Sequence, residues 1–158
     1  MHQTAQRIFV FALALWVGSL VTIGYIVAPA LFITLADPQA AGMVAGGLFY
    51  VEGTISLITG VLLLVLANLL VKRGLNRYRS VRWFLLVMLL AAAGMAFVTQ
   101  PMMDALRQEA LDLGLAVMQS PMAESFKRLH GLSSVLYLLQ SIFGLAILWR
   151  VSKPIDAD

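Results

Sequence analysis

Two polar stripes lie inside long apolar segments of this chain, and they hold the residues best suited to chemistry. Glu52, Ser56 and Thr59 are spaced i, i+4, i+7, which places them on one face of a helix. Glu52 is the only carboxylate well inside an apolar segment of the sequence. A carboxylate at membrane depth is costly and marks a functional site by default.

The second stripe is formed by His130, Ser134, Tyr137 and Ser141, at spacing i, i+4, i+7, i+11. Such a row must face protein or water, because unpaired polar groups in lipid are too costly. We expect this face to turn toward Glu52. An ionisable His–Glu pair in a site of low dielectric constant can handle a proton, a metal ion or a small ligand.

The same polar residues also have a purely structural interpretation. Hydrogen bonds between membrane helices contribute about 0.6–2 kcal/mol each and can fix the register of a bundle. The sequence leaves both interpretations open. The candidate ligand-binding residues are Glu52, Ser56, Gln100, His130, Ser134 and Tyr137.

A metal or haem site is a further hypothesis. His130, Met102 and Met103 are expected near the same end of the bundle, and imidazole with thioether ligands suits Cu(I). Methionine is also a common gap-filler in apolar cores. Haem ligation by His130 would lack a second axial histidine within the spans, since the other histidine is His2. Copper and haem are therefore both possible cofactors.

The elements that must position these residues are membrane spans. The chain of 158 residues is 61% hydrophobic and only 12% charged, whereas soluble domains carry about 25% charged residues. A helix needs about 20 apolar residues to cross a bilayer. We predict an all-α integral membrane four-helix bundle in one domain, 1–158, with spans at about 8–33, 43–71, 83–103 and 130–150.

The loop charges predict the orientation. Residues 72–82 contain five Lys or Arg, whereas the 34–42 connection contains none. The positive-inside rule places the 72–82 loop in the cytoplasm of an inner-membrane protein. Both termini are then cytoplasmic, and Glu52, Gln100 and His130 lie in the outer leaflet. The first span is too long for the apolar core of a signal peptide, so we expect it to be retained.

Smaller features predict how the bundle is completed. Apolar residues at helical spacing between Pro101 and Pro121 predict an amphipathic helix on the outer surface. A bend is expected near Pro29. Small residues let membrane helices approach closely, and candidates are Ala14, Gly18, Thr22, Gly53, Ser56, Gly60, Ala91, Ala92, Ala93, Gly94, Gly131 and Gly144.

Several motifs occur in a characteristic order. A W-V-G-S-L segment at 16–20 precedes V-A-P-A-L-F at 27–32, a glycine-rich segment at 41–49, Gln100-Pro101, and F-x-x-L-H-x-x-S at 126–133. This order resembles the transmembrane-protein-205-like family, a domain of unknown function (DUF4149), over nearly the whole chain. The eukaryotic member of that family is associated with tolerance of platinum drugs.

The arrangement is also distantly similar to copper-resistance protein D and to the four-helix HemJ-type protoporphyrinogen oxidases. That similarity implies handling of a metal or a tetrapyrrole. The chain departs from the oxidase pattern, because span one has no histidine and no span contains a lysine.

These observations favour a membrane protein whose outward-facing Glu/His site binds a small cation or ligand, in transport or tolerance. Transport by four short helices would require a homo-oligomer. The alternatives are a non-catalytic membrane scaffold or accessory subunit, and a haem-linked redox protein. No nucleophile–base set, phosphate loop or dinucleotide fingerprint is present, so we do not expect an enzyme. The small net charge of +3 gives no reason to expect nucleic-acid binding.

Overall fold

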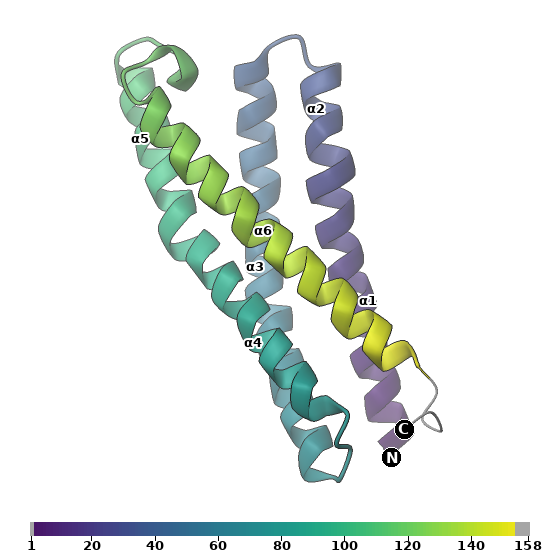
Figure 1. The fold of residues 1–158 in the computed structure, drawn as a ribbon. Coiled ribbons are helices and arrows are strands. Elements are labelled where there is room, and N and C mark those ends of the chain that lie inside the picture. Colours follow the sequence, from purple (N-terminus) through teal and green to yellow (C-terminus); the bar gives the residue numbers. More distant parts are fainter. Residues whose placement is uncertain (1, 154–158) are drawn as a thin grey trace.

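Four long helical rods run up and down the molecule in the computed structural model, which describes residues 2–153 (Figure 1). All the described elements are helices. The first rod consists of α1 (His2–Thr22), the π-helix η1 (Ile23–Val27) and α2 (Ala28–Thr34), and the second rod is α3 (Pro38–Lys72). The third rod consists of α4 (Tyr78–Gly94), the π-helix η2 (Met95–Thr99) and α5 (Gln100–Asp112). A short 3-10 helix, η3 (Val117–Gln119), leads to the fourth rod, α6 (Ala123–Ser152).

Each rod is long and apolar enough to cross a membrane. The rods contain 30 to 35 residues, or roughly 45–52 Å of helix, against a hydrocarbon core of about 30 Å. They must therefore tilt or extend beyond the core. Large apolar side chains remain exposed along them, including Phe11, Ile33, Phe97 and Trp149. This confirms the predicted four-helix membrane bundle, a multi-pass protein of the lipid bilayer.

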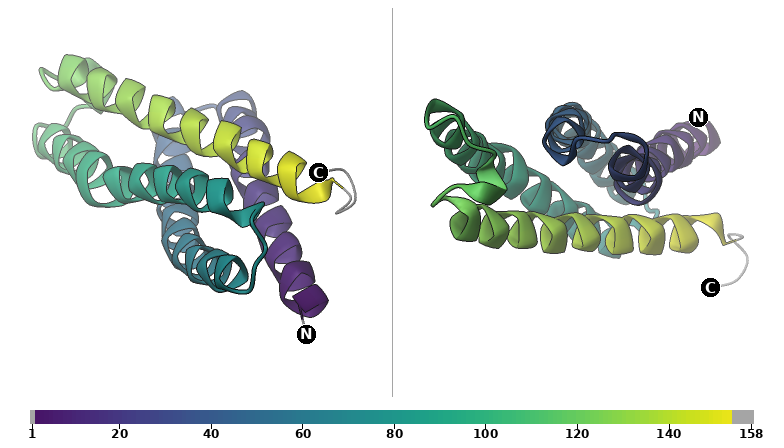
Figure 2. Two further views of the ribbon diagram at one scale, coloured as in Figure 1. Left: turned by 60° about the horizontal axis from the view of Figure 1, so that its bottom comes forward. Right: turned by 90° about the horizontal axis from the view of Figure 1, so that it is seen from above.

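The rods pack in a ring in which α1 contacts α3, α3 contacts α4, α4 contacts α6 and α6 contacts α1. Figure 2 shows α6 running beside α4 and crossing over α1. The apolar core lies near the termini. Its residues are Phe9, Leu13, Trp16, Val17, Leu20, Leu63, Ala67, Leu70, Tyr78, Val81, Leu85, Met88, Ile147 and Val151, and it continues to Met95 and Tyr137 at the middle of the bundle. The middle of the bundle instead buries the polar residues Glu52, Ser56, Thr99, Ser133, Gln140 and Ser141.

Both π-helices precede a proline by two residues. Pro29 follows η1, and Pro101 follows η2. A proline lacks an N–H group and its ring crowds the carbonyl four residues earlier, and a wider π turn relieves that contact. The rods therefore continue past both prolines, with α2 beginning around Pro29 and α5 around Pro101.

The predicted amphipathic helix between Pro101 and Pro121 needs correction. Its first half is α5, which continues the third rod rather than forming a separate surface helix. Its second half is a turn at Gly114, which has a φ of +69°, followed by the 3-10 helix. Met103 and Ala110 are buried as the pattern required, but Leu113 is 56% exposed. The span predicted to end at about 103 reaches Asp112.

The small residues divide into two groups. A Cβ atom on Gly144 would lie 2.8 Å from Val17, and one on Gly60 would lie 3.1 Å from Leu89, so both glycines allow close packing as predicted. Gly18 and Gly131 have no such neighbours within 4 Å. The prediction that Ala14, Gly18 and Thr22 mediate packing within the bundle is wrong, because all three are exposed.

Both termini and the 73–77 connection lie at one end of the bundle, and the α2–α3 and α5–α6 connections lie at the other (Figure 1). This arrangement follows from four antiparallel rods. Which end faces the cytoplasm stays a prediction.

Candidate functional site

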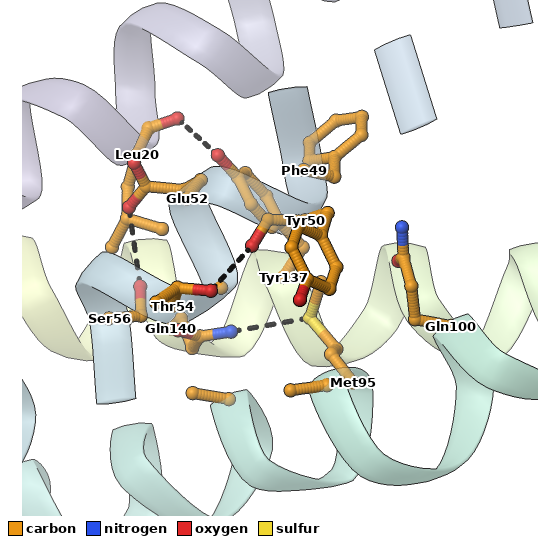
Figure 3. A pocket seen from close by; sticks show the side chains of 13 residues that line it. Leu20, Phe49, Tyr50, Glu52, Thr54, Ser56, Met95, Gln100, Tyr137 and Gln140 are labelled. Atoms are coloured by element: carbon orange, nitrogen blue, oxygen red, sulfur yellow. Dashed lines mark hydrogen bonds between the residues drawn. The ribbon is translucent and has the colours of Figure 1, made fainter. Parts of the chain in front are cut away.

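A chain of hydrogen bonds leads from α1 to a buried carboxylate on α3. The indole Nε1–H of Trp16 donates to Ser56 Oγ at 2.8 Å, and Ser56 Oγ donates to Glu52 Oε1 at 3.2 Å. Glu52 is only 1% exposed. Its second oxygen, Oε2, is buried without a hydrogen-bond partner among the described residues. One half of the carboxyl group is therefore held in place (Figure 3). The other half receives no hydrogen bond, because the neighbouring Ser19 hydroxyl donates to the Trp16 carbonyl oxygen at 2.8 Å.

Gln140 on α6 leaves a second buried acceptor unpaired. This side chain is 2% exposed, and its Nε2 lies 3.3 Å from Met95 Sδ, a weak acceptor. Its carbonyl oxygen Oε1 has no hydrogen-bond partner within the described part of the chain. Buried polar atoms normally find a partner, so each exception calls for an explanation such as an unseen water or ion.

Tyr137 lies between these two residues and α1. Its hydroxyl donates to the carbonyl oxygen of Leu20 at 2.7 Å. Its ring packs edge-on against Phe49 at a centroid distance of 5.2 Å. The ring fits because Gly24 lacks a side chain: a Cβ atom there would lie 2.2 Å from Tyr137 Cε1.

A small cavity lies among these side chains. Its volume is about 30 Å³, which is enough for one or two water molecules. Exposed Tyr50 and Thr54 lie on its rim. The polar residues that line it are Glu52, Ser56, Gln100, Tyr137 and Gln140, together with the thioether of Met95.

Two further polar links position the helices around the cavity. Gln100 Nε2 donates to the carbonyl oxygen of Gly46 at 3.1 Å and ties the third rod to α3. Ser133 Oγ donates to Thr99 Oγ1 at 2.6 Å and ties α6 to the π-helix η2. The second π-helix therefore contributes both Thr99 and Met95 to this region.

The structure brings together four of the six candidate ligand-binding residues: Glu52, Ser56, Gln100 and Tyr137 all line the cavity. It does not bring His130 or Ser134 to them. Both are exposed, Ser134 Oγ donates to the His130 carbonyl at 2.8 Å, and the His130 ring stacks on Phe126. The expected contact between Glu52 and His130 is not made.

The predicted α6 face was displaced by a fraction of a turn. The spacing that begins at His130 and Ser134 includes Tyr137 and Ser141, but it skips Ser133 and Gln140, which are buried. The polar pattern alone fits either face. In the observed rotation, the missing side chain of Gly144 allows α6 to pack on Val17 and Met88. That contact requires the three-dimensional packing to be known.

Met102 and Met103 do not form a cluster with His130 around the cavity. Met102 is 50% exposed, Met103 is buried, and Met95 is the methionine that lines the cavity. Among residues 2–153 no group of three or more His, Cys, Asp and Glu side chains could hold a metal ion. The cofactor hypotheses, copper and haem, stay predictions.

Comparison with known proteins identifies a family but no activity. Residues 11–112 match the family model described as Domain of unknown function (DUF4149). The matched segment contains Glu52, Ser56 and Gln100, whereas Tyr137 and Gln140 lie beyond it. Neither a curated protein nor a solved structure matches the chain. Because the match extends over well more than half of its length, the chain belongs to the DUF4149 family.

Proposed function

We propose that the cavity at Glu52 binds a small cation, or a small molecule that donates hydrogen bonds, as part of a function in transport or tolerance. The supporting observation is the pair of buried oxygens, Glu52 Oε2 and Gln140 Oε1, that lack donors around one cavity of water size. Burying an unpaired charge is costly. A cation or a bound proton on this carboxyl group would remove that cost.

The donor atoms limit the class of ligand. The cavity offers a carboxylate, an amide oxygen and one thioether, from Glu52, Gln140 and Met95. Oxygen ligands suit hard cations, whereas copper(I) prefers sulfur and imidazole. The volume of about 30 Å³ admits a bare small ion, an ammonium ion or a water molecule.

The orientation belongs to the same proposal. The end that carries both termini also carries eight of the eleven Lys and Arg residues of the sequence, which supports a cytoplasmic location in an inner membrane. The cavity would then lie in the middle-to-outer part of the membrane. A homo-oligomer is required if the site serves transport, because one bundle is too small for two alternating pathways.

Thermal unfolding of purified protein tests the proposal. We expect one of Li⁺, Na⁺, K⁺ or NH₄⁺ to raise the Tm of the wild type, since a ligand at 100 times its Kd adds about 2.7 kcal/mol. Choline, which is too large for the cavity, should have no such effect. Glu52→Gln should abolish the shift, whereas Glu124→Gln, which changes an exposed carboxylate, should retain it.

A proton is the smallest possible ligand, and infrared spectroscopy detects it directly. A protonated buried carboxyl group gives a carbonyl band that is absent from Glu52→Gln and present in Glu124→Gln. If no cation stabilises the wild type and this band is missing, the binding proposal is wrong.

The second candidate is a membrane scaffold or accessory subunit. It is favoured by the Trp16–Ser56–Glu52 chain and the Ser133–Thr99 bond, which join different helices. Handling of a metal or a tetrapyrrole stays a prediction. It is implied by the resemblance to copper-resistance protein D and HemJ-type oxidases, which itself stays a prediction, as does the resemblance to the transmembrane-protein-205-like family. Elemental analysis and a visible spectrum of the same preparation would reveal copper or haem.

A further inference from the structure

A second hollow, far from Glu52, opens at the end of the bundle that carries the termini. Its volume is about 640 Å³, within the range of small-molecule sites. It lies between α1, the start of α4 and the end of α6. The lining residues include Arg7, Val10, Phe11, Ala14, Arg77 and Lys153.

The hollow combines three cationic residues with an apolar wall. Arg7, Arg77 and Lys153 line its polar part. The described acidic residues lie in the middle of the bundle or toward its opposite end, as the helix bounds require, namely Asp37, Glu52, Asp104, Glu109, Asp112 and Glu124. Within residues 2–153 these cations therefore have no acidic side chain at their own end of the bundle.

Arg77 is already oriented by the backbone of α6. Its Nη2 donates to the carbonyl oxygens of Arg150 at 2.6 Å and Lys153 at 3.0 Å. A guanidinium group has five N–H donors in a rigid plane, so three remain available. A fixed, partly satisfied arginine is well suited to phosphate, which it contacts through paired hydrogen bonds.

The apolar wall extends from the charged end into the membrane. Arg7, Val10, Phe11 and Ala14 are spaced i, i+3, i+4, i+7 on α1, along one helical face. This stripe runs for roughly 10 Å along the helix. Phe11 is 69% exposed, and Val10 is half-buried. An anion with no apolar part would leave this wall uncovered.

We infer that this hollow binds one anionic phospholipid, with its phosphate on Arg7, Arg77 and Lys153 and an acyl chain along Val10, Phe11 and Ala14. Basic hollows between spans on the cytoplasmic side suit such headgroups. The site is independent of the Glu52 cavity, so the failure of either proposal leaves the other standing.

Native mass spectrometry of the full chain tests this inference. The protein is released from nanodiscs that contain equal amounts of phosphatidylglycerol and phosphatidylcholine with identical chains. The wild type should retain phosphatidylglycerol in preference. Arg7→Gln and Lys153→Gln should each lower the ratio of bound phosphatidylglycerol to bound phosphatidylcholine about fivefold, which is the effect of one charge near the membrane surface. Neither substitution removes a side-chain hydrogen bond that holds the fold.

The matched control is Arg128→Gln, which neutralises an exposed arginine at the other end and should leave the ratio unchanged. Equal retention of the two lipids, or an equal loss in Arg128→Gln, would overturn the inference. Displacement of the lipid by inorganic phosphate would also overturn it, because the acyl chain would then contribute nothing.

Discussion

The hydroxyl of Tyr137 donates a 2.7 Å hydrogen bond to the carbonyl oxygen of Leu20, three residues before the π-helix η1. A carbonyl oxygen has two lone pairs, so it can accept from a side chain where the helical ladder changes its pattern. The bond joins α6 to α1 beside the cavity. The proline-linked π turn and the polar site are therefore parts of one arrangement.

Gly24→Ala should disturb this arrangement. The new Cβ atom would lie 2.2 Å from Tyr137 Cε1, while the ring is held by its hydroxyl bond and by Phe49. Overpacking of this kind costs about 1–3 kcal/mol, so we expect a lower Tm in mild detergent. Gly18→Ala on the same rod is the control, because nothing lies within 4 Å of its Cβ position. An equal Tm for the two variants would contradict the close packing of Tyr137 on Gly24.

Ser56→Ala should remove the central member of the Trp16–Ser56–Glu52 chain. It would leave the Trp16 N–H and Glu52 Oε1 without these partners. Buried groups left unsatisfied cost about 1–3 kcal/mol each, so the Tm should fall clearly. Ser134→Ala is the matched control on an exposed serine whose hydroxyl bonds only its own helix. A similar small change in both variants would mean that the chain contributes little to stability.

Gly144→Ala tests the helix crossing that sets the rotation of α6. The Cβ atom would lie 2.8 Å from Val17 Cγ2 and 3.1 Å from Met88 Cε. The helices must separate or the side chains must move, at about 1–3 kcal/mol. Gly131→Ala on the same helix has open space and should be neutral or stabilising, because alanine favours helix by about 1 kcal/mol over glycine. Tm values in the same detergent would rank the two variants.

The sequence predicts the four rods well because apolar length is a strong signal in a bilayer. It also predicts that Glu52 is buried, since a carboxylate within an apolar span must face the protein interior or water rather than lipid. It places Tyr137 of α6 beside Glu52 correctly, but it does not predict Gln140 there. His130 and Gln140 are both polar and lie on neighbouring faces. Gln140 faces inward in the helix rotation that packs Gly144 on Val17 and Tyr137 on Gly24. Nor does it predict that α5 continues past Pro101, which depends on the π turn.

Glu52→Met separates a binding role from a structural one. If the unpaired Oε2 is retained for a ligand, an apolar side chain of similar size should leave the Tm unchanged or raise it in cation-free buffer. The Ser56 hydroxyl loses Glu52 Oε1 as its acceptor, but it can donate to the backbone carbonyl four residues earlier in its own helix. Replacing buried charges by apolar residues is often neutral or stabilising, and sites of function commonly reduce stability. Glu52→Ala is the control for lost volume. It should lower the free energy of unfolding by about 2–5 kcal/mol, by analogy with other large-to-small changes, and therefore lower the Tm. A large loss of stability in Glu52→Met itself would show that the carboxylate stabilises the bundle, and would favour the scaffold function over ligand binding.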